Sequence, residues 1–163
     1  MTELNPYARF LDGRKLETIL GSTVPEIASL LAAIGAEKAA ASPAPGKWSA
    51  AEIVCHLADC ELEFAIRLRQ TLAEDVPMIQ SFDQDKWAAT YPGITAKQAL
   101  DAFSAFREWN RLLIAKALPA AADRKVTHPE RGTMTFLTLV ETLVGHDLNH
   151  LGQLRKLAGS QAG

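Results

Sequence analysis

The helical period of the apolar residues is the feature that most constrains the fold of this chain. In WSAAEIVCHLADCELEFAIRLRQTL (residues 48–72), apolar side chains recur every three or four positions, which predicts an amphipathic helix. The expected inward stripe consists of Ile53, Leu57, Cys60, Phe64 and Leu68. Ser49 followed by Glu52 is a capping box and indicates that the helix begins directly after Ser49.

A first helical region with the same period is expected from about Arg9 to Gly35. We expect it to be interrupted and restarted near STVPE. There Thr23 and Glu26 have the spacing of a second capping box, and Pro25 would occupy a tolerated position in the first turn.

A third long helix, AKQALDAFSAFREWNRLLIAKAL, is expected to begin after Thr95 and to end before Pro119. A last helix is expected over about Met134 to Ala158, where Gly159 would close it. Each of these segments has an apolar stripe that needs a partner, so the helices are expected to pack together.

The connections contain Pro and Gly and show no convincing alternating strand. We expect a loop at AAASPAPG (39–46), a long connection at 74–94 with one short helix around Asp83–Thr90, and a further loop at 119–132. The sequence therefore predicts one all-α domain over residues 1–163, a four-helix bundle with a long crossover connection.

The charge and composition of the chain restrict the classes of partner that it is expected to bind. A formal net charge of -2 and the lack of a basic run give no attraction to nucleic acid or to an anionic membrane. No segment is expected to reach the roughly 20 apolar residues that span a bilayer, and the N-terminus has no apolar signal core. Cys55 and Cys60 lie in one predicted helix with a poor geometry for a disulfide, so free thiols and a cytoplasmic location are expected.

Two histidines in VGHDLNHLGQL (144–154) carry the chemistry of the last helix. His146 and His150 are four positions apart and therefore share a face, at or within the stripe of Phe136, Val140, Leu143, Leu151 and Leu154. Inward imidazoles need partners for their ring nitrogens, and a divalent metal would satisfy both.

The third ligand is expected to be His56, which lies near the apolar stripe of the second long helix. His128 precedes Pro129 in a polar loop and is expected to be a turn residue. Three histidines leave coordination positions open for water or substrate, which is the arrangement of catalytic rather than structural metal sites.

The segments KWSAAEIVCHLADCE and GTMTFLTLVETLVGHDLNHLGQLRKL resemble the DinB-like superfamily of four-helix, metal-binding proteins. The resemblance covers most of the chain and implies that His56, His146 and His150 bind a divalent metal, commonly zinc or nickel. It also implies a small-molecule substrate. The family includes S-transferases and isomerases that use low-molecular-weight thiols, as well as hydrolases and members with no known reaction.

Two functions follow as hypotheses. The first is a metal-dependent enzyme. Thiol S-transfer is its leading reaction class, and metal-assisted hydrolysis is the second. The second hypothesis is a metal-binding protein without turnover, for example one related to stress. Alanine-rich segments such as LLAAIGAEKAA, together with the frequent pairing of family members, lead us to expect a homodimer.

Asp147 leaves two roles open. HDLNH has the form of a metalloprotease H-E-x-x-H motif with Asp in place of Glu, so Asp147 is a candidate base or a partner for an imidazole. The alternative is a buried acid paired with an arginine. Further polar residues near the inward faces are candidates to line the site or to be structural: Cys60, Glu63, Arg107, Asn110 and Gln153.

Overall fold

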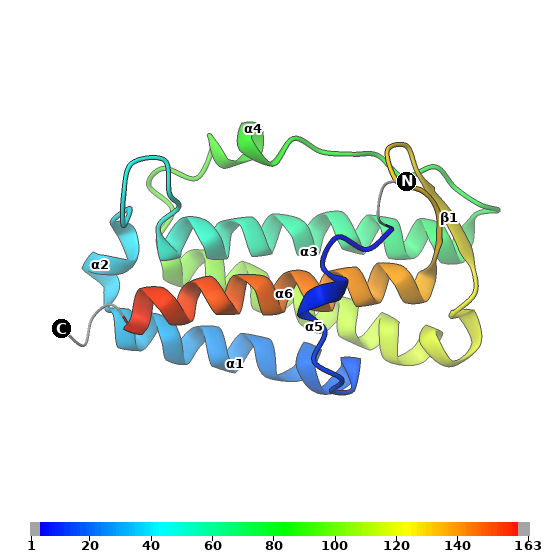
Figure 1. The fold of residues 1–163 in the computed structure, drawn as a ribbon, viewed down its shortest axis with the longest axis horizontal. Helices are drawn as coiled ribbons and strands as arrows, with labels where there is room; N and C mark the ends of the chain where they lie inside the picture. Colours follow the sequence, from blue (N-terminus) through cyan, green and yellow to red (C-terminus); the bar gives the residue numbers. More distant parts are fainter. Residues whose placement is uncertain (1–3, 160–163) are drawn as a thin grey trace.

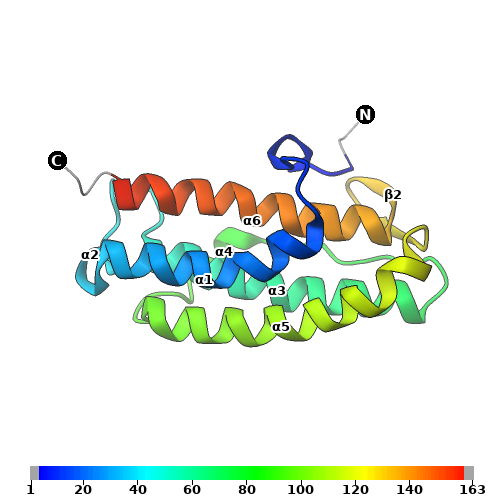
Figure 2. The same ribbon diagram turned by 90° about the horizontal axis from the view of Figure 1, so that it is seen from below.

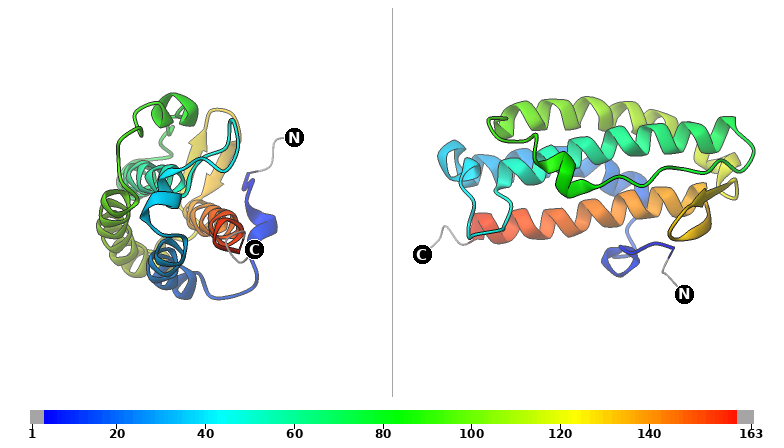
Figure 3. Two further views of the ribbon diagram at one scale, coloured as in Figure 1. Left: turned by 90° about the vertical axis from the view of Figure 1, so that its left-hand side faces the viewer. Right: turned by 90° about the horizontal axis from the view of Figure 1, so that it is seen from above.

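Four long helices lie side by side in the computed structural model, which describes residues 4–159 (Figure 1). They are α1 (Leu16–Ile34), α3 (Ala50–Ala73), α5 (Ala96–Ala121) and α6 (Phe136–Gly159). Around the bundle, α3 packs on α5, α5 on α1, α1 on α6 and α6 on α3, and the end-on view in Figure 3 shows this order. The predicted all-α four-helix bundle is confirmed.

The predicted crossover connection is also present. Helices α3 and α5 run in the same direction, and α1 and α6 run in the opposite one (Figures 1 and 2). Two parallel neighbours cannot be joined by a short turn, so the chain returns along the length of the bundle between Ala73 and Ala96. This return holds the short helix α4 (Gln84–Ala88), close to the expected Asp83–Thr90.

The expected loop at 119–132 is wrong, because its second half forms a hairpin. Strand β1 (Lys125–His128) pairs antiparallel with β2 (Gly132–Thr135). Isolated hairpins are marginal, but this one packs on the bundle through the buried Val126 and Met134. It also holds the crossover, since Thr127 exchanges backbone hydrogen bonds with Pro77 and Ile79.

The start of the first helical region differs from the expectation. A single 3-10 turn, η1 (Ala8–Phe10), precedes α1, which begins at Leu16 and continues through Pro25 without a restart. The side chain of Thr23 caps nothing; it is buried, and its hydroxyl donates to the carbonyl oxygen of Ile19 at 2.8 Å. Tertiary packing on both sides of the proline outweighs the lost backbone hydrogen bond.

Three boundaries near the other helices also differ. Helix α5 continues past Pro119 to Ala121, and α6 begins at Phe136 because Met134 and Thr135 belong to β2. The expected loop at 39–46 begins later than predicted, after the short helix α2 (Ala36–Ala40).

Local caps agree with the sequence. The Ser49 hydroxyl accepts the Glu52 backbone N–H at 3.2 Å, and the Glu52 carboxylate accepts the Ser49 N–H at 2.7 Å. Thr95 and Gln98 form the equivalent box at the start of α5. All members of the two stripes predicted for α3 and α6 are buried. The predicted inward faces of these helices are therefore correct.

By length and composition alone, α1 is a helix that could cross a membrane, with a mean hydropathy of 1.2 over its most apolar window. This differs from the expectation that no segment approaches that length. Helix α1 packs against α5 and α6 as a member of the bundle. Core helices satisfy the same criteria, so this property is weak evidence for a membrane span.

The N-terminal segment approaches α6 at Gly145, where a side chain has no room. A Cβ atom at this position would lie 2.6 Å from the carbonyl oxygen of Tyr7. We expect Gly145→Ala to push this segment away and to lower the free energy of unfolding by about 1–3 kcal/mol, the usual cost of overpacking. Urea unfolding measures this.

Gly152 lies on the same helix, and a Cβ there meets nothing within 4 Å. Gly152→Ala is therefore the matched control. It should stabilise the protein by about 0.5–1 kcal/mol through helix propensity. Equal effects of the two substitutions would show that the Tyr7 contact is not tight in solution.

Candidate metal centre

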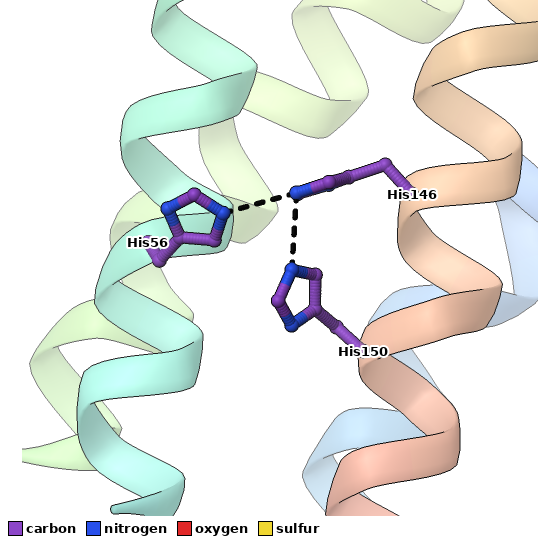
Figure 4. Close-up of side chains that lie close together, drawn as sticks. All are labelled: His56, His146 and His150. Carbon is purple, nitrogen blue, oxygen red and sulfur yellow. Dashed lines mark hydrogen bonds between the residues drawn. The ribbon is translucent and has the colours of Figure 1, made fainter. Parts of the chain in front are cut away.

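Three histidine side chains converge between α3 and α6 (Figure 4). His56 comes from α3, and His146 and His150 come from α6. The Nε2 atom of His146 lies 3.0 Å from the Nε2 atom of His56 and 3.0 Å from that of His150. All three residues are buried. The structure thus brings together the three residues that the sequence singled out.

Burial keeps these imidazoles neutral. Desolvation, followed by the nearby His150, lowers the pKa of His56 to about 3. Burial also lowers the pKa of His146 and of His150. A metal ligand must carry a free lone pair, so neutral rings are the form that binds a cation.

Gln153 orients one of the rings. Its Oε1 atom lies 2.8 Å from Nδ1 of His150, and an amide oxygen only accepts. His150 therefore carries its proton on Nδ1 and presents the lone pair of Nε2 to the other two histidines. Metal-binding histidines characteristically hydrogen-bond through the nitrogen that is not a ligand.

The donor set fits a divalent cation. Nitrogens bound to zinc at about 2.0–2.1 Å with tetrahedral angles lie about 3.3 Å apart, close to the spacing of these Nε2 atoms. One hydrogen on His146 Nε2 cannot satisfy both neighbours, and its Nδ1 atom is buried without a partner among residues 4–159. A shared cation satisfies all three lone pairs.

Cys60 lies beside this cluster but outside the group of mutually close ligand atoms. Its Sγ atom is 3.5 Å from His56 Nε2 and 3.8 Å from His146 Nε2, whereas the group within 4.8 Å of one another comprises the three histidines. Burial raises the pKa of the Cys60 thiol. Cys60 thus packs directly against the cluster, with its sulfur within 4 Å of two of the three imidazole Nε2 atoms.

The contacts of Asp147 are those of a buried acid paired with an arginine, the second of the two roles that the sequence left open. It is fully buried, and its two carboxylate oxygens accept from Arg107 at 2.7 and 2.9 Å. The Thr23 hydroxyl oxygen also lies 3.2 Å from it, so the single hydroxyl hydrogen is shared between Asp147 and the Ile19 carbonyl oxygen. Among the described residues, no imidazole hydrogen-bonds to Asp147. The arrangement is a buried acid–arginine pair that ties α6 to α5.

Glu61 completes this buried network and is absent from the sequence-based candidates. Its carboxylate accepts from Arg107 and from the side-chain amide of Asn110, the latter at 2.7 Å. A signal for it exists in the sequence. Glu61 follows Leu57 by four positions and precedes Phe64 by three, so it lies on the apolar stripe of α3. Arg107 and Asn110 therefore hydrogen-bond to buried carboxylates of the helix bundle and not to the histidine cluster.

A cavity of about 210 Å³ opens beside the histidines. His56 and His146 contribute to its wall, and Tyr7 from the N-terminal segment packs edge-on against the His146 ring at 5.1 Å between ring centroids. Its other walls come from the crossover, the hairpin and α3, with apolar side chains that include Phe64, Ile79 and Met134.

The expectation that His128 is a turn residue is wrong. It is the last residue of β1, is buried, and lines the same cavity without joining the histidine cluster. Glu63 pairs with Arg67 at 2.9 Å rather than with the site. Arg67 itself lines the cavity and was not among the sequence-based candidates.

These features define a class: a four-helix bundle with a crossover between the parallel helices α3 and α5, and a buried three-histidine cluster beside a cavity. The model of the DinB superfamily matches residues 22–154. The chain belongs to the DinB superfamily, as the resemblance in the sequence implied.

Relatives and a solved structure agree with this assignment. A protein of Oceanobacillus iheyensis named "Putative metal-dependent hydrolase OB0782" is 25% identical over 96% of this chain and 96% of its own. A second from the same organism, "Putative metal-dependent hydrolase OB0413", is 24% identical over 72% and 69%. The fold matches YfiT from Bacillus subtilis, described as a probable metal-dependent hydrolase, with a TM-score of 0.79, 18% identity and coverage of 90% and 85%.

Proposed function

We propose that this protein is a metal-dependent enzyme acting on a small molecule, with a divalent ion, zinc or nickel, held by His56, His146 and His150. The observation that carries the proposal is the convergence of three neutral imidazoles, two of which, those of His56 and His146, line a cavity. The names of the relatives support metal dependence. A three-histidine set leaves a coordination position for an exogenous ligand.

When bound, the ion supplies Lewis acidity and a lowered pKa for a bound water or thiol. The chain's own residues hold and shield that site. Gln153 orients His150, and Tyr7 covers the edge of the His146 ring. The Arg107–Asp147 pair holds the α6 backbone in place directly beside His146. In this proposal Asp147 positions the helix and does not act as a base.

Hydrolysis is the reaction we propose first, because the relatives are named as hydrolases. Thiol S-transfer is the second candidate, and the lining of the cavity favours it. Among the described residues that line the cavity, the only carboxylate is that of Glu130, which is exposed and belongs to the turn between β1 and β2. A bound metal would lower the pKa of a coordinated thiol so far that the thiol releases its proton to water and needs no such base.

The test is turnover by metal-loaded protein. We expect activity either against ester and amide substrates in water or with a low-molecular-weight thiol as co-substrate, and loss of it in His150→Ala. Cobalt-substituted protein should change its visible spectrum when a small thiol is added. A saturated coordination sphere, with no spectral response and no activity, would instead support the metal-binding protein without turnover.

Two expectations stay predictions. One is the homodimer, which light scattering at micromolar concentration measures; a single-chain mass would contradict it. The other is the cytoplasmic location, for which the two free cysteines remain the support.

A further inference from the structure

One end of the cavity holds hydrogen-bond donors that the proposed metal chemistry does not use. Arg67 lines this end and is 8% exposed. Its Nη2 atom donates to the Gln80 carbonyl oxygen at 2.7 Å and pairs with Glu63. Its Nε atom is buried without a partner among residues 4–159, and no hydrogen bond of Nη1 occurs within that range either. An arginine normally uses its planar fork of donors.

Further donors gather around Arg67. The Ser81 hydroxyl lines the cavity and is buried without a partner in the described part of the chain. His128 accepts the Glu130 backbone N–H on Nδ1 at 3.2 Å, so its proton is on Nε2 and available to donate. The side chain of Arg131 lines the cavity and makes no ion pair or hydrogen bond with residues 4–159.

The charges near this end are close together. Burial, followed by Arg67 and Arg131, lowers the pKa of His128, which places both guanidinium groups within electrostatic range of that ring. Glu63 offsets part of the Arg67 charge, and the exposed Glu130 lies at the rim. Unpaired donors buried in a cavity wall cost free energy unless a ligand satisfies them.

We propose that the Arg67 end of the cavity is a binding subsite for a carboxylate group of the substrate, with Ser81, His128 and Arg131 as further donors. The substrate class is then a small carboxylic acid with an apolar body, because the apolar side chains of Phe64, Ile79 and Met134 line the same cavity. A cavity of about 150 Å³ holds benzene, so 210 Å³ accommodates a ring with a short acidic arm.

The proposed carboxylate subsite and the metal centre use different side chains. The backbone positions of His56 and Arg67 are eleven residues, about 16 Å, apart along one face of α3. The Arg67 side chain approaches the cluster more closely, since its charge acts on Cys60, whose Sγ atom lies 3.5 Å from His56 Nε2. A carboxylate held by Arg67 still uses donors other than the imidazole nitrogens. The assignment of this acid as a substrate rests on the proposed function, but its binding does not require a metal.

The experiment is calorimetric titration with phenylacetate and with its neutral analogue phenylacetamide, before and after removal of the metal. We expect phenylacetate to bind in both states and phenylacetamide to bind about tenfold or more weakly, because its neutral amide forms weaker hydrogen bonds with guanidinium groups than a carboxylate does. Equal affinity for the two compounds would overturn the proposal.

Variants locate the binding. Glu63→Gln/Arg67→Gln removes both charges of the pair and leaves no unpaired carboxylate, and in Arg131→Gln no described contact is broken. Each should weaken phenylacetate binding about tenfold. Arg111→Gln is the control, because that arginine is exposed on α5 and pairs with Glu108. Unchanged affinity in both the double variant and Arg131→Gln contradicts the subsite.

Two outcomes separate this inference from the proposed function. Binding that disappears with the metal but survives the arginine substitutions would show that the carboxylate ligates the metal, which overturns the subsite. Binding that depends on Arg67 in protein with no bound metal supports the subsite, whether or not the metal-loaded protein then shows turnover.

Discussion

Replacing His146 by alanine is expected to leave the purified protein with almost no divalent metal. His146 Nε2 lies 3.0 Å from the Nε2 atoms of both other histidines and is the central member of the cluster. Loss of a group that only orients a ligand lowers metal affinity by about 10–100-fold, and removal of a ligand should exceed this. Elemental analysis of the purified protein measures the result, with close to one ion per chain expected for the unaltered protein.

His56→Ala and His150→Ala should have the same effect, and His128→Ala is the matched control. His128 is also buried in the wall of the cavity but lies outside the cluster. Its replacement should leave the metal content unchanged. If His128→Ala emptied the site and His56→Ala left it full, the assignment of the third ligand would be wrong.

Chelation should also lower the melting temperature of the unaltered protein. A ligand at 100 times its Kd stabilises the folded state by about 2.7 kcal/mol, and 1 kcal/mol corresponds to roughly 2–4 °C for a chain of this size. We therefore expect a decrease of about 5–10 °C on addition of a chelator. The His146→Ala protein should show no such decrease, because it has no metal to lose.

The second large effect is expected from the buried ionic network. Arg107 is 2% exposed and bridges Glu61 and Asp147, both of which are fully buried. Arg107→Leu leaves two carboxylates inside the bundle without their cation. Breaking a buried ion pair on one side costs about 3–5 kcal/mol. Urea unfolding should show a loss of that size or a chain that fails to fold.

Arg111→Leu on the same helix is the control, because that arginine is exposed and pairs with Glu108 at the surface. Its removal should change the free energy of unfolding by less than about 1 kcal/mol. Restoring balance with Glu61→Gln and Asp147→Asn should recover part of the stability lost in Arg107→Leu. A loss of less than about 1 kcal/mol for Arg107→Leu would mean that the carboxylates are protonated or hydrated.

Local signals in the sequence predict the helices well and their interruptions poorly. The boxes at Ser49 and Thr95 depend on residues three positions apart, so the sequence contains everything needed to place them. Pro25 and Pro119 are also local signals. They predict a helix start and a helix end, but α1 and α5 continue through them. The cost of a proline inside a helix is offset by packing with distant parts of the chain, which a local pattern does not contain.

The hairpin escapes prediction for the same reason. Its strands are four residues long, too short to show an alternating pattern, and they are stabilised by the bundle and by the crossover at Pro77–Ile79. Both the position of His128 and the Arg67 end of the cavity depend on this hairpin. Neither follows from the residues around Pro129, because the walls come from segments that are far apart in the chain.

The sequence by itself determined the four long helices, the inward faces of α3 and α6 and the pairing of His146 with His150, and it singled out His56 as the third candidate ligand. Spacing along a helix fixes which side chains share a face, so four positions of separation are enough to pair His146 with His150. Only the tertiary structure decided that His56, 90 positions from His146, reaches them, and that Asp147 turns to Arg107. Those contacts depend on how the helices pack, and packing is set by the whole core rather than by any one segment.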